Sequence, residues 1–370
     1  SGKIDRIEKN KDGTYELYDY KTGTPVSSKK VEIGESREDY FNQLCFYKYA
    51  FEKMTNKKVS KVENTEETDY NLKTKQKDEE IFQNIYNLID NFMKTTPNPL
   101  FNNIEIETVN RCNGTCSFCP VNKNQDPREY KKMPKELFEK IIKELKEINY
   151  DGAIALHSNN EPLLDKEIYN YAEYARKELP NSYIYLYTNG TLLTIDKFLD
   201  LTENLDLMVI DNYNDNIQLI EPVKEIFDYC IQHPELKKKV LIDLRLQNQI
   251  LTSRGGQSDN RNEILTLKSS CLLPFNKIVV QPDGKVPLCC CDPFGKVILG
   301  DLNTAKLVDI WNGKKAKEIR EILYKKENSR KNLELCKQCD VLVEKLDGIP
   351  YTNTDITNQW KNLYSIFNIQ

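Results

Sequence analysis

Three cysteines stand close together in the stretch "NRCNGTCSFCP", residues 110–120, and their spacing limits what they can bind. Cys112, Cys116 and Cys119 form the pattern CxxxCxxC directly after a predicted strand. A structural zinc site uses four ligands, usually in two CxxC-type pairs, and the sequence offers no fourth donor near these three. Three thiolates suit a [4Fe–4S] cluster in which one iron stays open. An open iron binds ligands, so we expect this loop to serve catalysis.

The composition of the whole chain argues against several classes of protein. Its 370 residues suit two or three domains, and a formal net charge of −4 provides no basic field to recruit nucleic acid. No run of about 18 apolar residues could span a membrane, and no signal peptide opens the chain. Eleven cysteines here favour ligands over disulfides, so we expect a cytoplasmic protein with reduced thiols. The first residue is Ser rather than Met, which indicates a fragment or a tag remnant.

The middle of the chain alternates between predicted strands and predicted helices. Amphipathic helix patterns at 134–148 and 165–179 separate short apolar runs. Such alternation predicts an α/β fold with a parallel sheet or barrel. The strand candidates are residues 104–109, 152–157, 183–188, 205–211 and 240–246.

Strand periodicity separates the two faces of these strands. The outer face of a barrel strand packs on helices and must be apolar, so polar residues at alternate positions point inward. In "VLIDLRLQ" this rule places Asp243, Arg245 and Gln247 inside the barrel. In "YIYLYT" it places the three tyrosines on one face.

With these features the sequence resembles the radical S-adenosylmethionine (SAM) superfamily over about residues 102–345, through the cysteine motif with an aromatic residue before its third cysteine. The resemblance implies a partial (β/α)6 TIM-like barrel. It also implies that the open iron binds the amino and carboxylate groups of SAM. The reduced cluster would then cleave SAM to a deoxyadenosyl radical that abstracts hydrogen from a substrate. An electron donor such as flavodoxin or ferredoxin would be a partner.

The same resemblance implies which side chains contact SAM. Phe118 is expected to lie against the adenine. The stretch "HSNNEPLL" resembles the Gly-Gly-Glu-Pro turn of the family, with Asn159 and Asn160 in place of the glycines. Asn tolerates positive φ, so we expect the turn to survive. Asn160 and Glu161 would then meet the amino group of SAM.

Further cofactor contacts are expected from three other strands. By resemblance, Arg245 would pair with the SAM carboxylate, and Asp211 or Thr188 would bind the ribose or the amino group. The alternative is that these polar groups satisfy one another inside the barrel. His157, just before the turn, is expected to pack or hydrogen-bond rather than to act as an acid or base.

A second set of cysteines resembles the SPASM or twitch extension of these enzymes, through "CLLPF", "DGKVPLC", "LVDIWN" with Arg320, and "CKQCD". The resemblance implies an auxiliary [4Fe–4S] cluster ligated by Cys271, Cys289, Cys336 and Cys339. The stretch "FNKIVVQPDGKVPLCCC" at 275–291 is predicted to form a hairpin with a turn at Pro282-Asp283-Gly284. In its second strand Cys290 could replace Cys289, because adjacent strand residues point to opposite faces. A structural zinc site is the alternative on spacing alone. A cluster with four thiolate ligands is expected to pass an electron rather than to bind substrate.

Residues 1–60 resemble the PD-(D/E)xK nucleases of the RecB type, through "GKIDRI", "YELYDYKTG" and "QLCFY". A predicted hairpin carries Asp5 and Asp19, which would bind a divalent cation such as Mg²⁺, and Lys21 would position or activate the water. Gln43 and Tyr47 match the helix signature of that family. The alternative is a surface hairpin with solvated charges. Because the family's upstream helix and acid or histidine are absent, we expect no DNA cleavage, and we expect the charged stretch at 56–80 to be loose.

These features divide the chain into a partial nuclease-like segment, a radical SAM partial barrel, a SPASM/twitch domain and a C-terminal tail, at 1–97, 102–265, 266–345 and 346–370. The leading hypothesis is a radical SAM oxidoreductase that acts on a small polar substrate such as a sugar- or cyclitol-like alcohol. The alternatives are a peptide-modifying enzyme of the same type, a metal-dependent DNA nuclease and a non-catalytic iron–sulfur electron carrier. No candidate peptide-recognition domain precedes the barrel, which favours the small substrate.

Overall fold

The computed structural model describes the backbone of most of the chain, and side chains from residue 79 onward. The described residues are 6–9, 15–19, 59–64, 68–258, 260, 267–325, 328–346 and 348–369. The chain divides into two compact units, Ser1–Gln83 with Asn362–Gln370, and Asn84–Lys361. All the described cysteines lie in the second unit. The four predicted segment boundaries stay a prediction.

The N-terminal unit contains a three-stranded sheet in the order β1-β2-β3. Strands β1 (Arg6–Lys9) and β2 (Tyr15–Asp19) form the predicted antiparallel hairpin, and β3 (Val59–Asn64) pairs with β2 in parallel. Helix α3 (Thr68–Lys94) follows. The expectation of a loose stretch at 56–80 was therefore wrong for residues 59–64 and 68–80. Backbone hydrogen bonds form an edge strand whatever its side chains, and the lysine, glutamate and glutamine residues of α3 are good helix formers.

The residues predicted to bind metal and water in this unit can be placed only in part. Asp19 is the last residue of β2, and the description of that strand does not extend to its side chain. Asp5, Lys21, Gln43 and Tyr47 lie outside the described residues. The nuclease-like role of all five stays a prediction.

The second unit is built on a six-stranded, all-parallel sheet in the order β8-β7-β6-β5-β4-β9. The expected α/β fold is confirmed. Its strands are β4 (Asn103–Ile106), β5 (Ala153–Ala155), β6 (Tyr183–Thr188), β7 (Leu207–Tyr213), β8 (Val240–Arg245) and β9 (Lys277–Val280). The first arm of the predicted hairpin at 275–291 is β9, and it joins the barrel sheet beside β4 instead of standing apart from it.

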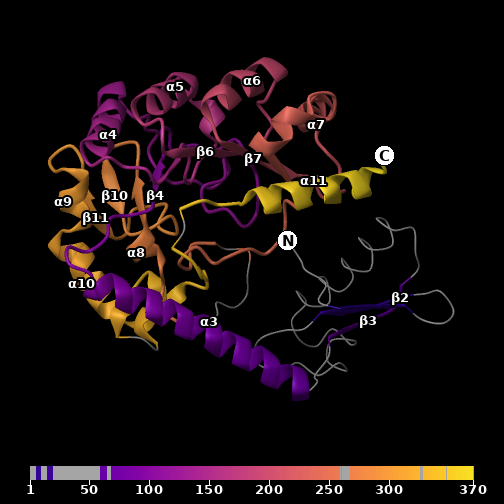
Figure 1. Cartoon of the computed structure of the whole chain (residues 1–370), viewed down its shortest axis with the longest axis horizontal. Coiled ribbons are helices and arrows are strands. Elements are labelled where there is room, and N and C mark those ends of the chain that lie inside the picture. Colours follow the sequence, from indigo (N-terminus) through magenta and orange to yellow (C-terminus); the bar gives the residue numbers. More distant parts are fainter. Residues whose placement is uncertain are drawn as a thin grey trace. The chain divides into compact units, whose positions relative to one another are not determined.

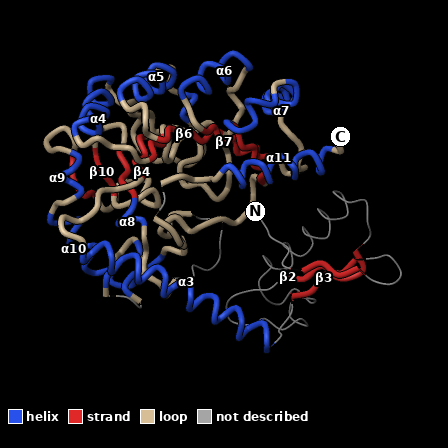
Figure 2. Tube along the Cα trace, in the orientation of Figure 1, coloured by secondary structure: helices blue, strands red, loops and turns tan. Residues whose placement is uncertain are grey.

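Four helices form an arc outside this sheet (Figure 1), and Figure 2 shows them in blue around the red strands. They are α4 (Lys135–Glu147), α5 (Ile168–Glu178), α6 (Ile195–Asn204) and α7 (Glu221–Gln232). Apolar residues recur along one face of α4, where Phe138 and Ile142 are fully buried. Ile104 and Ile106 on β4 are also fully buried, as expected for strand positions that face helices. Within the described residues, no helix combines the length and apolarity needed to cross a membrane.

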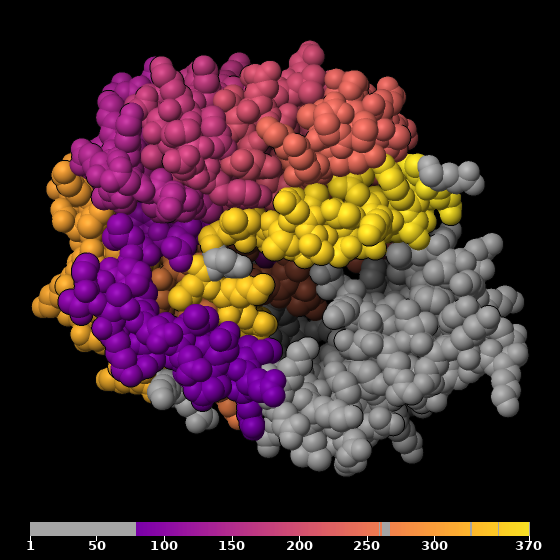
Figure 3. Space-filling view, in the orientation of Figure 1, coloured from indigo at the N-terminus to yellow at the C-terminus, as the bar shows by residue number. Residues whose placement is uncertain are grey.

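The remaining elements follow β9 or connect the barrel elements. They are α8 (Leu273–Asn276), β10 (Lys285–Pro287), β11 (Ile298–Asp301), α9 (Leu307–Trp311), α10 (Lys314–Tyr324) and α11 (Asn353–Phe367), with 3-10 turns at Pro162–Leu164, Pro234–Lys239, Ser329–Asn332 and Cys336–Gln338. The predicted turn before β10 is present, with Gly284 at φ +84°. In α11, Trp360 stacks on Phe227 with ring centroids 5.5 Å apart, and Figure 3 shows the yellow C-terminal helix against this salmon-coloured region.

A buried arginine joins α10 to the elements around it. Arg320 donates hydrogen bonds to the carbonyl oxygens of Pro274 (2.8 Å) and Trp311 (2.7 Å), and its guanidinium lies 3.9 Å from the Trp311 ring centroid. Burial lowers the pKa of Arg320 to about 10. The guanidinium therefore holds α8, which directly precedes β9, against α9.

We expect Arg320→Met to lower the free energy of unfolding by about 2–4 kcal/mol, because two buried carbonyl groups lose their donors. Urea unfolding under anaerobic conditions would measure the change. The exposed Lys317 on the same helix provides the control, and Lys317→Met should change stability by less than about 0.5 kcal/mol. Equal effects of the two substitutions would contradict this role of Arg320.

Candidate functional site

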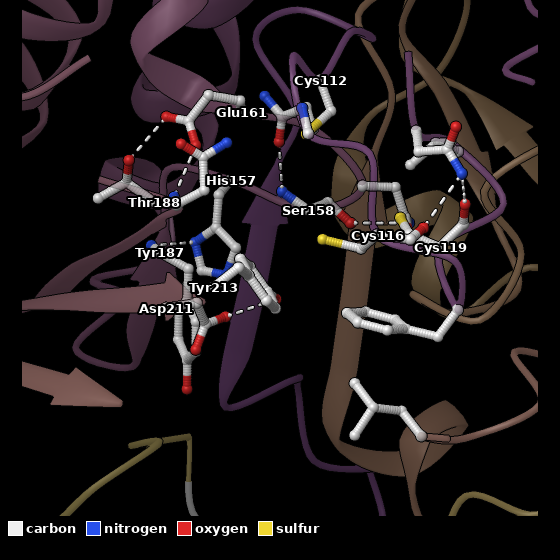
Figure 4. A pocket seen from close by; sticks show the side chains of 18 of the residues that line it. Cys112, Cys116, Cys119, His157, Ser158, Glu161, Tyr187, Thr188, Asp211 and Tyr213 are labelled. Carbon is white, nitrogen blue, oxygen red and sulfur yellow. Dashed lines mark hydrogen bonds between the residues drawn. The ribbon is translucent and has the colours of Figure 1, made fainter. Parts of the chain in front are cut away.

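The loop after β4 brings the three N-terminal cysteines together beside a cavity (Figure 4). The backbone N–H of Gly114 donates to the Cys112 sulfur at 3.3 Å. The side-chain amide of Asn122 donates to the carbonyl oxygens of Cys116 (3.1 Å) and Cys119 (2.9 Å). These contacts hold the loop curled, so that all three cysteines line the same cavity.

The chemistry of these thiols fits an iron–sulfur cluster. Burial raises the pKa of Cys112 and Cys116 to about 12, so the thiols keep their protons unless a bound metal replaces them. A single zinc ion needs ligands that converge at about 2.3 Å on one point. In the described part of the chain, no three His, Cys, Asp or Glu side chains are arranged in that way. A cluster accepts thiolates that are farther apart, each on its own iron.

The cavity has a volume of about 320 Å³ and is lined from the ends of several parallel strands. This is the edge where ligands bind in α/β folds. All six side chains predicted to contact SAM line it, namely Phe118, Asn160, Glu161, Thr188, Asp211 and Arg245. The structure thus brings the predicted set together, and the contact that each would make stays a prediction.

Glu161 is the most firmly held carboxylate of the cavity. It accepts hydrogen bonds from the Thr188 hydroxyl (2.8 Å) and from the backbone N–H groups of Leu163 (3.0 Å) and Asn189 (2.8 Å). Burial raises the pKa of Glu161 to about 7 although these donors oppose the rise. A cationic group of a ligand would stabilise its charge, which fits the predicted contact with the amino group of SAM.

In the turn that carries Glu161, the two asparagines do not have the backbone conformation that we expected. Neither Asn159 nor Asn160 has a positive φ, so the argument from left-handed conformation was wrong. Instead, Asn159 donates to the Cys290 carbonyl oxygen at 3.0 Å and accepts from Arg254 at 2.6 Å. The side-chain nitrogen of Asn160 is buried without a partner, and the residue lines the cavity, so a ligand oxygen would satisfy it.

Arg245 lies between two aspartates at the end of β8. Its Nε contacts Asp211 at 2.6 Å and its Nη2 contacts Asp243 at 2.8 Å. Strand periodicity placed Asp243 and Arg245 on the same inner face, and this prediction is confirmed. The guanidinium is therefore already neutralised, as the alternative proposed, although it also lines the cavity and has a remaining nitrogen for a ligand carboxylate.

The aromatic and imidazole groups complete the wall. Phe118 is buried and lies 5.8 Å from the Tyr213 ring centroid. His157 accepts a hydrogen bond from the Tyr187 backbone N–H at 3.2 Å and packs at 5.4 Å from Tyr185. Burial lowers the pKa of His157 to about 4, so the ring is neutral near pH 7. The expectation that it hydrogen-bonds and packs is confirmed.

The second cysteine set forms a cluster of its own. Burial, followed by the neighbouring thiols of Cys289, Cys271 and Cys339, raises the pKa of Cys336 above its usual value. These four are the predicted auxiliary ligands, and they lie close enough to interact. Cys290 instead lines the first cavity, which favours Cys289 over Cys290 as the ligand.

Two arginines that sequence analysis missed hold the segments of the site. The fully buried Arg330 donates to the carbonyl oxygens of Ser269 (2.9 Å), Ser270 (2.9 Å) and Cys339 (3.3 Å), which brings the last cysteine pair to Cys271. Arg254, whose φ is +46°, lines the first cavity.

The loop that carries Arg254 also needs its two glycines. Gly255 and Gly256 both have positive φ, and a Cβ on Gly256 would lie 2.4 Å from Gln338. The "RGG" sequence was the available signal for this tight approach.

Glu105 and Lys277 were missed as well. The pattern "IEIE" at 104–107 alternates as "VLIDLRL" does, so the rule used for β8 would have placed Glu105 inside the barrel. Lys277 gave no such signal, because the strand that it opens was assigned to a hairpin outside the sheet.

Comparison with known families agrees with this geometry. The model of the radical SAM superfamily matches residues 106–227, and the model of SPASM, an iron–sulfur cluster-binding domain, matches residues 271–340. A model of the PD-(D/E)XK nuclease superfamily matches residues 1–151 and overlaps the radical SAM match.

Individual proteins similar to this chain are also S-adenosylmethionine-dependent. The chain is 28% identical over 242 residues to the S-adenosyl-L-methionine-dependent 2-deoxy-scyllo-inosamine dehydrogenase of Niallia circulans, and the match covers 65% of this chain and 93% of that protein. The crystal structure of BtrN in complex with AdoMet and 2-DOIA is similar with a TM-score of 0.60 and 28% identity, over 68% of this chain and 98% of BtrN. BtrN in an open conformation gives a TM-score of 0.51 at 25% identity, over 69% and 99%.

This chain belongs to the radical SAM superfamily and carries a C-terminal SPASM domain. It is an iron–sulfur oxidoreductase, and its cofactors are SAM, a catalytic [4Fe–4S] cluster and an auxiliary [4Fe–4S] cluster.

The pKa of Glu161 predicts how SAM affinity depends on pH. Below about pH 7 the carboxyl group of the free protein is protonated, and it is then a weaker acceptor for the N–H groups of SAM. We expect the dissociation constant of SAM to rise roughly eightfold from pH 7.5 to pH 6, following the ionised fraction of Glu161. Anaerobic calorimetry on the cluster-loaded protein would measure this dependence. Glu161→Gln should bind SAM more weakly and without the pH dependence, and an unchanged slope in that variant would contradict the assignment.

Proposed function

We propose that this protein dehydrogenates a small cyclitol- or sugar-like alcohol, while its auxiliary cluster takes up an electron. The observation that carries the proposal is that two cavities meet at one polar wall. The first cavity adjoins Cys112, Cys116 and Cys119, and a second, of about 580 Å³, adjoins the first. Glu105, His157 and Tyr187 line both cavities. A substrate in the second cavity would therefore lie next to the first cavity, where we place SAM.

The side chains of the second cavity suit a hydroxylated ring. His157 accepts a hydrogen bond at Nδ1, so its proton lies on Nε2 and can be donated to a substrate oxygen. Glu105 offers carboxylate oxygens, and Tyr185 offers a hydroxyl. A sugar-like alcohol presents donors and acceptors around its ring, so these groups can fix its orientation. The relative named as a dehydrogenase of 2-deoxy-scyllo-inosamine supports this class of substrate.

The cofactors supply hydrogen-atom abstraction when they are bound, and the chain supplies the geometry. Conversion of an alcohol to a ketone removes a hydrogen atom from carbon, a proton from oxygen and one further electron. The auxiliary cysteines suit that electron, because Cys290 beside them lines the first cavity and its carbonyl is bonded to Asn159. Three thiolates, from Cys112, Cys116 and Cys119, would hold the catalytic cluster with one iron open to SAM.

Two further features belong to the proposal. Reductive cleavage of SAM consumes an electron, so we propose a partner such as flavodoxin or ferredoxin. None of the ten described cysteines forms a disulfide, which fits a reducing compartment, and we place the reaction in the cytoplasm. The nuclease-family match at residues 1–151 makes a metal-dependent nuclease a second candidate function of the same chain.

Anaerobic reconstitution with iron, sulfide, SAM and dithionite tests the main proposal. We expect deoxyadenosine release that depends on an added cyclitol, together with a ketone product detected by mass spectrometry. Cys116→Ala should lose about half the iron and all SAM cleavage, because the catalytic cluster loses one of three ligands. Deoxyadenosine release at the parental rate by this variant would contradict the motif assignment. Magnesium-dependent DNA cleavage by the parental preparation would instead favour the nuclease.

The auxiliary cluster can be tested separately. Replacing Cys336 and Cys339 together with Ser should leave SAM cleavage intact but abolish ketone formation, because the electron then has no acceptor. The iron content should again fall by about half. Cys230→Ser is the control, since Cys230 is a buried thiol of α7 that belongs to neither set. Ketone formation at the parental rate by the double variant would contradict the proposed electron path.

A further inference from the structure

A buried ion pair stands in the wall between the two cavities. Lys277 opens β9 opposite Asn103 of β4, so its side chain shares the inner face of the sheet with Glu105. The ammonium group of Lys277 contacts one oxygen of Glu105, and the two side chains are 18% and 7% exposed. Both residues line the second cavity. The charge of the carboxylate is thus neutralised within the protein.

The rest of the pair's surroundings is polar, and it includes the Cys290 thiol, which interacts electrostatically with both Glu105 and Lys277. The other oxygen of Glu105 accepts a hydrogen bond from the Ser158 hydroxyl at 2.7 Å; Figure 4 labels Ser158 and His157 on this wall. The Tyr185 hydroxyl accepts from Asn103 at 2.8 Å. His157 is neutral. The other acidic residue of the second cavity, Glu344, is exposed.

We propose that Lys277 makes this protein selective for a polyol that presents a hydroxyl group, rather than an ammonium group, to this wall. The inference rests on the proposed function and narrows its substrate class. A hydroxyl group both donates and accepts, so it can donate to Glu105 and accept from Lys277 at once. An ammonium group of a substrate can only donate. It would lie beside the positively charged Lys277, and the nearby carboxylate of Glu105 is already paired with this lysine.

The prediction separates this protein from the relative named for an aminated cyclitol. The natural substrate of this chain would be the neutral counterpart, a cyclitol or sugar alcohol with oxygen where that compound has nitrogen. The ammonium group of Lys277 has three N–H donors and uses one of them for Glu105, so two remain for substrate oxygens.

The test compares two ligands that differ in one group. One is 2-deoxy-scyllo-inosamine, and the other has a hydroxyl in place of its amino group. Anaerobic calorimetry on the holoenzyme with SAM would give both dissociation constants near pH 7. We expect the parental protein to bind the hydroxyl compound at least roughly tenfold more tightly, because like charges that face each other are costly.

Substitutions of Lys277 and Glu105 test whether Lys277 causes this selectivity. Lys277→Met should reduce or reverse the preference, because Glu105 then becomes free to bind the ammonium group. The double variant Glu105→Gln/Lys277→Met removes both charges without leaving one unpaired, and it should not gain affinity for the amine. The control is Lys131→Met, which removes a lysine paired with Asp283 at 2.9 Å outside both cavities, and it should keep the parental preference.

The outcomes are distinct. A parental preference for the amine would overturn the inference while leaving the dehydrogenase function standing. An unchanged preference in a folded Lys277→Met protein, judged by its iron content and melting temperature, would overturn it as well. If neither compound bound to any variant and neither was oxidised, the proposed function would fail and this inference would fail with it.

Discussion

The guanidinium group of Arg128 joins the segments that must meet at the site. It contacts Glu107 at 3.0 Å just after β4, Asp126 at 2.9 Å after the cysteine loop, and the Asn159 carbonyl oxygen at 3.1 Å. It also donates to the Pro293 carbonyl oxygen at 3.3 Å beyond the second cysteine hairpin. Burial raises the pKa of Glu107 to about 7, and the nearby Arg128 opposes that rise. A buried arginine with two carboxylates is expensive to break, so both cysteine loops keep a fixed position relative to the turn that carries Glu161.

Charge pairing explains where ligands can bind inside the barrel. Arg245 is shared by Asp211 and Asp243, and Lys277 is paired with Glu105. Of the charged side chains that line the first cavity, Glu161 and Arg254 form no ion pair among the residues that the structure describes. Glu161 is held by uncharged donors, and Arg254 by Asn159. A ligand with N–H donors and a carboxylate, together with an anionic cluster, would engage both groups, which is the reason that SAM fits there.

The first cavity is lined by the three N-terminal cysteines and by Cys290, although about 150 residues separate the two cysteine sets in sequence. The strand β9 is the link, because it joins the barrel beside β4 and leads directly into the cysteine hairpin. Cys290 then reaches the first cavity while Cys289 lies with the auxiliary set. Both cysteines lie beyond β10, which ends at Pro287, in a turn where the Asp292 N–H donates to the Cys289 carbonyl oxygen at 3.0 Å. This turn, and not the strand alternation expected from the sequence, directs the two side chains to different sites.

The sequence by itself determined the features that depend on local spacing. The CxxxCxxC pattern, the alternating strands and helices, and the inner position of Asp243 and Arg245 follow from periodicities of a few residues. The strand at 59–64 and the placement of β9 could not be predicted, because strand pairing depends on partners that are far away in the chain. For the same reason only the tertiary structure placed Lys277 against Glu105 and Arg128 against the Asn159 turn. Buried charges find their partners by the folding of the whole chain, and no local pattern specifies which distant carboxylate or carbonyl will meet them.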